Sequence, residues 1–230
     1  MITDEQIQFW DENGYLKYGK VLEQGDVAEL LERLDQIALI ESKGGDDSSV
    51  EFSVGHARDE TEAGYEPEAI RQYLNLWKRD EAYDKVVRHP LVTGITKRLL
   101  KTPALRLWHD HMISKPPGEN ARFQFHQDFY NWPLADPNIL TCWIALDDAT
   151  VANGCMHVVP GSHRDPRFSV EARKLELEEL AKNPDARTER VIMGEHPASF
   201  GVPVELKSGE CMFHHSLNFH STPKNTTDSQ

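Results

Sequence analysis

The sequence has 230 residues, 39% of them hydrophobic, and its 25 Lys and Arg against 38 Asp and Glu give a formal net charge of −13. This length and composition predict one domain with a sizeable core. The acidic balance argues against a nucleic-acid partner, which requires a basic surface. The apolar runs are too short to span a bilayer, and residues 1–6 lack the basic and apolar regions of a signal peptide. We therefore expect no membrane partner.

The cysteines are Cys142, Cys155 and Cys211. Their number is odd and low, and no pair has the Cys-x-x-Cys spacing of a redox or zinc motif. Such usage is typical of reduced thiols in the cytoplasm. We therefore expect a cytoplasmic protein in which the three cysteines are buried packing residues.

Residues 1–100 are expected to form a mainly helical scaffold. Residues 4–12 combine a candidate N-cap, Asp4, with an apolar side, and Gly14 can adopt the left-handed conformation that ends a helix. Residues 25–40 place apolar side chains at three- and four-residue steps, which predicts a helix with one buried face. Further elements are expected at residues 15–18 (a strand), 73–78 (a strand or a helix end), 82–87 and 91–100 (helices), and 41–68 (loops with a candidate strand at 50–54).

From residue 105 the hydrophobic period changes to two, which is typical of strands. Strands are expected at residues 105–113, 122–128, 139–146, 202–206, 211–214 and 217–220, with a turn at 116–120. An insertion at 164–200 contains a predicted helix over 169–182, with an apolar stripe of Leu175, Leu177 and Leu180, and then an irregular segment. Short strands with Gly and Pro turns predict a mainly β fold. We expect a single domain, 1–230, with a double-stranded β-helix (jelly-roll or cupin-like) core over 101–230 and N-terminal helices.

The candidate functional residues begin with His126 and Asp128. Their i, i+2 spacing on an extended strand points both side chains to the same face. With His220 from a distant strand, they form the set of two histidines and one carboxylate that binds iron in non-haem Fe(II) oxygenases. The sequence therefore predicts a metal site at these three residues.

Other histidines leave alternatives open. His214 and His215 are rivals for the third ligand position, although we favour a supporting role for them behind the ligands. His109 and His111 form a His-x-His pair of the kind that joins a metal in other cupins. Here we favour a place in the pocket wall, with one of the two hydrogen-bonding a substrate or co-substrate.

The chain resembles the phytanoyl-CoA dioxygenase family, a branch of the Fe(II)/2-oxoglutarate oxygenases. The motifs that carry the resemblance are Asn13-Gly14-Tyr15-Leu16, Lys115-Pro116-Pro117-Gly118, His126-Gln127-Asp128, Cys142-Trp143-Ile144-Ala145-Leu146-Asp147, Asn153-Gly154-Cys155 leading to Pro160-Gly161-Ser162-His163, and Gly209-Glu210 followed by His220-Ser221-Thr222 and Asn225. They occur in the family's order and cover nearly the whole chain apart from residues 41–68 and 164–200.

The resemblance implies that iron is bound by the catalytic residues His126, Asp128 and His220. It implies 2-oxoglutarate and O2 as co-substrates, with ascorbate in support, and contacts to 2-oxoglutarate from His111, Gln127, Trp143 and Thr222. The implied reaction is hydroxylation of a small-molecule substrate with release of succinate and CO2. Asp128 favours hydroxylation, because family members that halogenate have a small residue in its place. The acidic composition favours a small free metabolite over a coenzyme A ester.

Two departures from the family's pattern concern the co-substrate. His111 stands where the family has Met. The family also has an arginine beyond the distal histidine, suited to a bidentate contact with the far carboxylate of 2-oxoglutarate, whereas no arginine follows His220 here. We expect the natural sequence to continue past Gln230. The alternative is a metal-binding cupin-like protein without oxygenase turnover, which the missing arginine supports.

Overall fold

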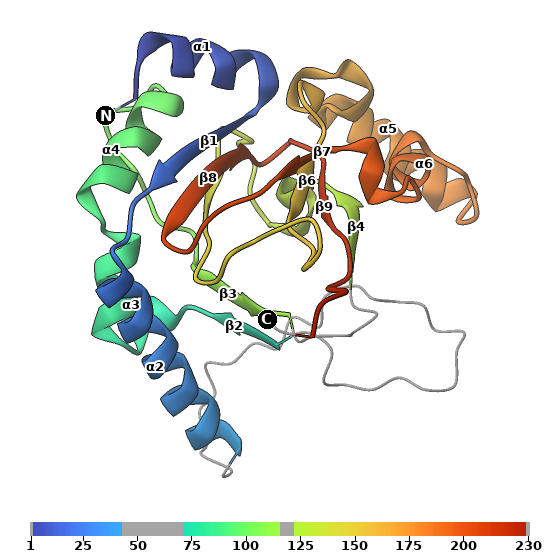
Figure 1. Cartoon of the computed structure of the whole chain (residues 1–230). Coiled ribbons are helices and arrows are strands. Elements are labelled where there is room, and N and C mark those ends of the chain that lie inside the picture. Colours follow the sequence, from blue (N-terminus) through green and yellow to red (C-terminus); the bar gives the residue numbers. More distant parts are fainter. Residues whose placement is uncertain (1, 43–70, 116–121, 229–230) are drawn as a thin grey trace.

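The computed structural model describes residues 2–42, 71–115 and 122–228 (Figure 1). Its α-helices are α1 (Asp4–Asn13), α2 (Gln24–Ser42), α3 (Glu81–Val87), α4 (Pro90–Leu99), α5 (Val170–Lys182) and α6 (Glu189–Gly194). Its strands are β1 (Tyr15–Lys20), β2 (Arg71–Leu74), β3 (His111–Ser114), β4 (Phe123–His126), β5 (Leu140–Ile144), β6 (Met156–Val158), β7 (Val202–Val204), β8 (Glu210–His215) and β9 (His220–Thr222). The candidate strand at 50–54 and the turn at 116–120 lie outside the described residues.

The described strands form three antiparallel sheets. One sheet has the order β1-β8-β5, a second has the order β4-β9-β6-β7, and β2 pairs with β3. The N-terminal helices lie beside the first sheet, whereas α5 and α6 lie beyond β4 of the second (Figure 1). This arrangement confirms the predicted β core with a helical layer.

Strand β8 shows how the chain places polar chemistry between the two larger sheets. Its side chains alternate in direction, as in any strand. Cys211 and Phe213 pack into the core cluster shared with the N-terminal helices. Met212 instead packs with residues of the second sheet, and His214, two residues on, points the same way toward Asp128. Because β8 is buried on both faces, a histidine on its inner face is shielded from water and needs a polar partner.

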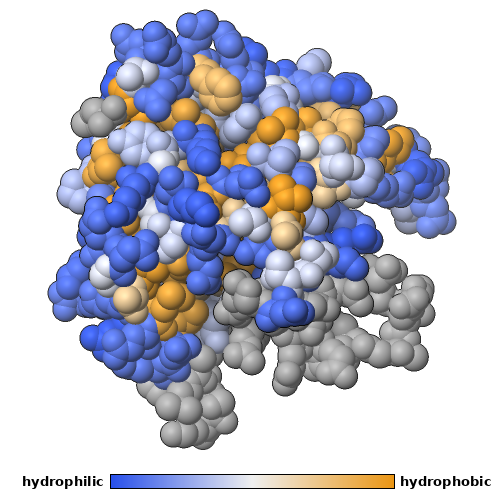
Figure 2. Space-filling model, in the orientation of Figure 1, coloured by the Kyte–Doolittle hydropathy of each residue, from blue (hydrophilic) through white to orange (hydrophobic). Residues whose placement is uncertain are grey.

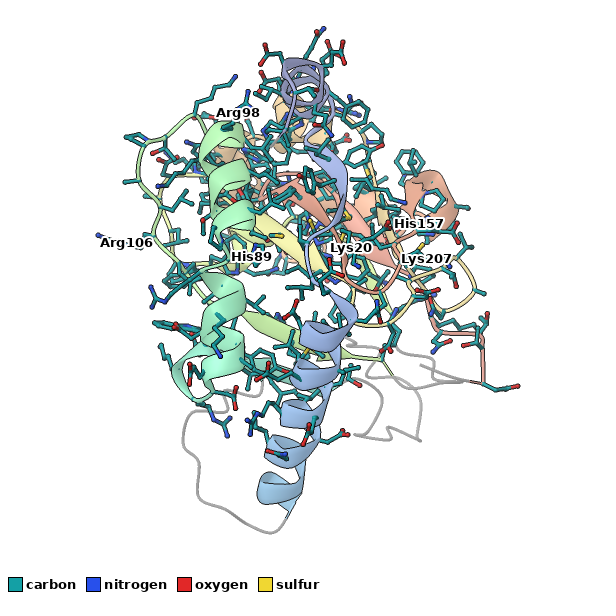
Figure 3. All side chains as sticks on the ribbon, turned by 60° about the vertical axis from the view of Figure 1, so that its left-hand side comes forward. Lys20, His89, Arg98, Arg106, His157 and Lys207 are labelled. Carbon is teal, nitrogen blue, oxygen red and sulfur yellow. The ribbon has the colours of Figure 1, made fainter. Side chains whose placement is uncertain are left out.

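The helical layer is held by the face that the apolar periodicity predicted. Leu30 of α2 and Ile95 of α4 are buried in one cluster with Phe213. Hydrophilic side chains cover most of the outer surface of α1 and α2 (Figure 2). At the top of α4, Arg98 reaches α1, where it donates hydrogen bonds to the Ile2 carbonyl and, at 3.2 Å, to Asp4 (Figure 3). None of the helices in the described ranges is long and apolar enough to cross a membrane.

The predicted cap of α1 is wrong by one residue. Thr3, not Asp4, is the N-cap: its hydroxyl accepts from the Gln6 N–H at 3.2 Å, and the Gln6 side chain accepts from the Thr3 N–H at 2.9 Å. This reciprocal capping box satisfies two N–H groups that the first turn leaves free. At the other end Gly14 has φ 72°, the left-handed exit that the sequence predicted.

Replacing Thr3 with Ala should therefore lower the free energy of unfolding by about 1 kcal/mol, because one half of the capping box is lost. Asp4→Ala, which removes an exposed partner of Arg98, should change it by less than about 0.5 kcal/mol. Urea denaturation of the two variants measures both values. Equal losses would contradict the assignment of the cap.

Several predicted elements differ from the structure. The strand expected at 105–113 is confined to β3, the one expected at 217–220 begins only at His220, and residues 73–78 contain the end of β2 and a 3-10 helix at Leu76–Lys78. In the insertion, residues expected to be irregular contain α6, and helix α5 has no buried residue. Leu175 and Leu177 are 67% and 51% exposed, so their predicted apolar stripe does not pack against a core.

Candidate metal centre

His126, Asp128 and His220 converge on one point. His126 ends β4 and lies opposite His220 in the register of β4 with β9. Oδ1 of Asp128 lies 3.6 Å from His126 Nε2 and 3.5 Å from His220 Nε2. One ligand atom from each residue lies within 4.8 Å of the others. The structure thus brings together the three residues that the sequence singled out for a metal.

The backbone between His126 and Asp128 explains this convergence. The chain stays extended through Gln127, with φ −118° and ψ 128°, so the side chains on either side of it share a face. The sequence predicted that Asp128 belongs to the strand, and this is wrong. Asp128 is instead the first residue of a 3-10 helix (Asp128–Asn131). Strand β4 therefore ends at His126, and Asp128 follows it by two residues.

Each histidine of the site is oriented by a backbone carbonyl. His126 Nδ1 lies 2.8 Å from the Gln124 carbonyl, and His220 Nδ1 lies 3.1 Å from the Asn218 carbonyl. A carbonyl only accepts, so both Nδ1 atoms carry the proton. Both Nε2 atoms face Asp128 and are the ring atoms left to bind a metal, which is the arrangement of metal-binding histidines.

The charges of the site also suit a cation. Burial lowers the pKa of His220 to about 3, with help from His126, so its imidazole is neutral. Although burial opposes it, the neighbouring imidazoles hold the pKa of Asp128 well below its usual value. For His126 the effect of Asp128 outweighs burial and raises the pKa. A buried carboxylate that draws a proton onto an adjacent imidazole is a site where a metal ion can replace that proton.

The second oxygen of Asp128 is held from behind. Its Oδ2 lies 3.1 Å from His214 Nε2 and accepts a hydrogen bond from the Thr141 hydroxyl at 3.2 Å. His215 faces elsewhere: its Nδ1 accepts the Leu217 N–H at 3.1 Å. The geometry therefore places His214 behind the carboxylate, whereas His215, the last residue of β8, bonds the turn that follows the strand.

The residues predicted to contact 2-oxoglutarate come from several strands. His111 and its neighbour His109 are close enough to feel the charge of Asp128. Burial nevertheless lowers the pKa of both histidines, that of His111 to about 4. Trp143 is on β5 opposite Met212, and Thr222 is on β9 two residues beyond His220. Gln127 points away from Asp128, because its amide donates to the Leu217 carbonyl at 2.5 Å.

Lys115 is a polar residue of this region to which the sequence assigned no role. Its Nζ donates to the Thr222 hydroxyl at 3.2 Å, to the Gly154 carbonyl at 3.4 Å and to the Pro223 carbonyl. Burial lowers its pKa to about 8. The Lys-Pro-Pro-Gly motif marked the position, but the contact with β9 comes from the folded chain.

Comparison with known proteins places this geometry in a family. The sequence model of the family phytanoyl-CoA dioxygenase (PhyH) matches residues 10–230. A probable phytanoyl-CoA dioxygenase of Caenorhabditis elegans is 25% identical over an alignment of 237 positions, and the match covers 99% of this chain and 72% of the relative. The peroxisomal phytanoyl-CoA dioxygenase of Rattus norvegicus is 25% identical over an alignment of 232 positions, and the match covers 99% of this chain and 65% of the relative. The chain thus spans about two-thirds of the length of the rat protein.

A solved structure has the same fold. The non-heme alpha ketoglutarate dependent carbocyclase SnoK from nogalamycin biosynthesis matches with a TM-score of 0.69 and 26% sequence identity. The match covers 99% of this chain and 80% of the carbocyclase. It confirms the predicted cupin-like fold class.

Proposed function

The chain belongs to the phytanoyl-CoA dioxygenase family, and we propose on that premise that it is an Fe(II)- and 2-oxoglutarate-dependent dioxygenase that hydroxylates a small molecule. The observation that carries the proposal is the approach of two imidazole Nε2 atoms to one carboxylate oxygen, at 3.6 and 3.5 Å. Two histidines and one carboxylate are the donor set of non-haem Fe(II) oxygenases. In this proposal His126, Asp128 and His220 hold the iron.

The bound iron and 2-oxoglutarate supply the activation of O2, with release of succinate and CO2, and the protein supplies position and a dry surrounding. His126 and His220 keep their lone pairs on the metal side because backbone carbonyls bind their Nδ1 protons. Asp128 stays ionised and keeps Oδ1 toward the imidazoles because His214 and Thr141 engage Oδ2. These contacts fix the donor atoms before a metal arrives.

For 2-oxoglutarate we propose contacts from His111, Trp143 and Thr222, and from Lys115 through its charge. The ammonium of Lys115 already touches Thr222, which stands two residues beyond His220. A cation at this place can bind the far carboxylate of the co-substrate, the role assigned in the family to an arginine. The predicted contact of Gln127 stays a prediction, since its amide is engaged on the other side of the strand.

For the substrate we propose a small organic molecule that lies against aromatic walls. The rings of His109 and Trp132 meet edge to face at 5.6 Å, and His109 also lies 6.1 Å from His111. Because burial lowers the pKa values of both histidines, these walls are neutral at pH 7. The reaction that we propose is hydroxylation. The carbocyclase SnoK shows that a protein of this fold can also catalyse ring closure. A single domain over 1–230 in the cytoplasm remains part of the proposal.

Replacing His214 with Leu should raise the dissociation constant of Fe(II) or Co(II) by about 10- to 100-fold, because partners behind a metal ligand orient it. The variant removes the 3.1 Å contact between His214 Nε2 and Asp128 Oδ2. Asp128 Oδ2 then keeps only the hydrogen bond from the Thr141 hydroxyl. His214→Gln keeps a donor and should recover part of the affinity. Isothermal titration with Co(II) measures both values, and an unchanged affinity in His214→Leu would contradict the role given to His214.

The direct test is succinate formation from 2-oxoglutarate with Fe(II) and ascorbate. Slow turnover without substrate, dependent on iron, is the expected result. The alternative function, a metal-binding cupin-like protein without turnover, predicts metal binding but no succinate. It also predicts that 2-oxoglutarate does not raise the melting temperature of the iron-loaded protein, whereas a ligand that binds the native state must raise it.

A further inference from the structure

Gln127, which separates His126 at the end of β4 from Asp128, is buried, and both the nitrogen and the oxygen of its side-chain amide are hydrogen-bonded. Its Nε2 donates to the Leu217 carbonyl at 2.5 Å, and its Oε1 accepts from the guanidinium of Arg190. A flipped amide would place an N–H group against the guanidinium and two oxygens against each other, so one orientation is allowed. On an extended segment, fixing Gln127 on one face fixes the direction of His126 and Asp128 on the other.

The same side chain ties the two ligand-bearing segments together. Leu217 lies in the turn between β8 and β9, three residues before His220. A backbone bond from the Phe129 N–H to the Ser216 carbonyl, at 3.1 Å, makes a second link between these segments. Gln127 thus links the segment that carries His126 and Asp128 to the segment that carries His220.

Arg190 reaches Gln127 from helix α6 of the insertion, which lies beside β4 (Figure 1). Its Nε donates to Glu176 at 2.7 Å, one Nη donates to the Ser169 carbonyl at 3.3 Å, and the other donates to Gln127. The guanidinium lies 4.1 Å from the ring centroid of Tyr130, and the side chain is 13% exposed. Its planar, forked donors suit this set of partners, which a lysine could not satisfy together.

Glu176 keeps the guanidinium in place. Besides Arg190 it accepts from Arg173 at 2.7 Å and from the Thr188 hydroxyl at 2.5 Å. Glu176 lies on α5, a helix that buries no residue. This polar network therefore joins α5 to α6 and, through Arg190, joins the insertion to β4.

We propose that Arg190 is a positioning residue of the metal centre: it orients Gln127 and thereby holds His126, Asp128 and His220 at their distances. The proposal rests on the proposed function of this centre. It gives residues 164–200 a role in the site, although none of them contacts the three ligand residues in the described interactions.

The test compares Co(II) affinity by isothermal titration in matched variants. Arg190→Ala should raise the dissociation constant about tenfold, the size of effect known for groups behind metal ligands. Arg190→Lys, which keeps the charge, should also weaken binding, because one ammonium cannot serve Glu176 and Gln127 together. Arg187→Ala removes an exposed ion pair with Glu195 in the same segment, at 2.5 Å, and should leave the affinity unchanged.

A double-mutant cycle separates positioning from general stability. If Arg190 acts through Gln127, then Arg190→Ala combined with Gln127→Ala should bind Co(II) no more weakly than the worse single variant. Hydrogen exchange at residues 216–220 of the metal-free protein should be faster in Arg190→Ala and unchanged in Arg187→Ala. Additive losses, or wild-type affinity and exchange in Arg190→Ala, would overturn the inference. If the wild type binds no Co(II), the proposed metal centre itself fails, and the exchange experiment alone decides the role of Arg190.

Discussion

Asp128→Ala should abolish 2-oxoglutarate turnover, with a fall of at least about 10³-fold, because metal-based catalysis contributes several kcal/mol and depends on the full donor set. The variant removes the oxygen that faces both imidazoles and leaves His214 Nε2 without its acceptor. Succinate formation with Fe(II) and ascorbate measures the loss.

Asp136→Ala is the matched control for this variant. Asp136 lies eight residues further along the chain, is exposed, and accepts a hydrogen bond from the Asn138 N–H at 2.9 Å. Its turnover should stay within about twofold of the wild type, since a surface change of this kind has little effect. Succinate formation that persists in Asp128→Ala would refute the assignment of Asp128 as a ligand.

Lys115→Met should weaken 2-oxoglutarate binding by about 10- to 100-fold, because a hydrogen bond to a charged group contributes about 1.5–3 kcal/mol. The maximal rate with saturating co-substrate should change much less than KM. Lys115→Arg keeps the charge and should retain most of the affinity. A KM in Lys115→Met equal to that of the wild type would show that Lys115 only braces Gly154 and Pro223.

The same residue predicts a pH dependence. Burial lowers the pKa of Lys115 to about 8, and the protonated form is the one that attracts a carboxylate. The affinity for 2-oxoglutarate should therefore be high below pH 8 and fall as the pH rises through that value, by up to about tenfold per pH unit. The fall should be absent in Lys115→Met.

The proposed ligand set could be predicted from the sequence because part of its geometry is local. His126 and Asp128 are two residues apart, and an extended backbone places them on one face without any knowledge of the rest of the fold. His220 could not be predicted from local spacing, since its pairing with His126 joins residues that are 94 positions apart in the sequence. The ordered motifs of the family supplied that pairing in advance.

The contacts behind the site could not be predicted in the same way. Arg190 meets Gln127 across 63 residues and from a segment expected to be irregular. Lys115 meets Thr222 across 107 residues. No periodicity in either segment encodes such pairs, because a single long side chain and one acceptor are enough to make each contact.

Local signals also failed where two of them competed. Asp4 is a good N-cap residue, but Thr3 and Gln6 satisfy the reciprocal pattern that fixes the start of α1. In α5, Leu175 and Leu177 suggested a buried stripe, yet the helix is held through Glu176, which accepts hydrogen bonds from Thr188 and Arg190. Polar attachment of this kind leaves no trace in hydrophobic spacing.

The most direct measurement is an anaerobic titration of the protein with Fe(II) and 2-oxoglutarate, followed by visible charge-transfer absorption. We expect a band that saturates at one iron and one 2-oxoglutarate per chain and that is absent in Asp128→Ala. A folded wild-type protein that shows no band at saturating iron and 2-oxoglutarate would contradict the proposal that His126, Asp128 and His220 form an oxygenase centre.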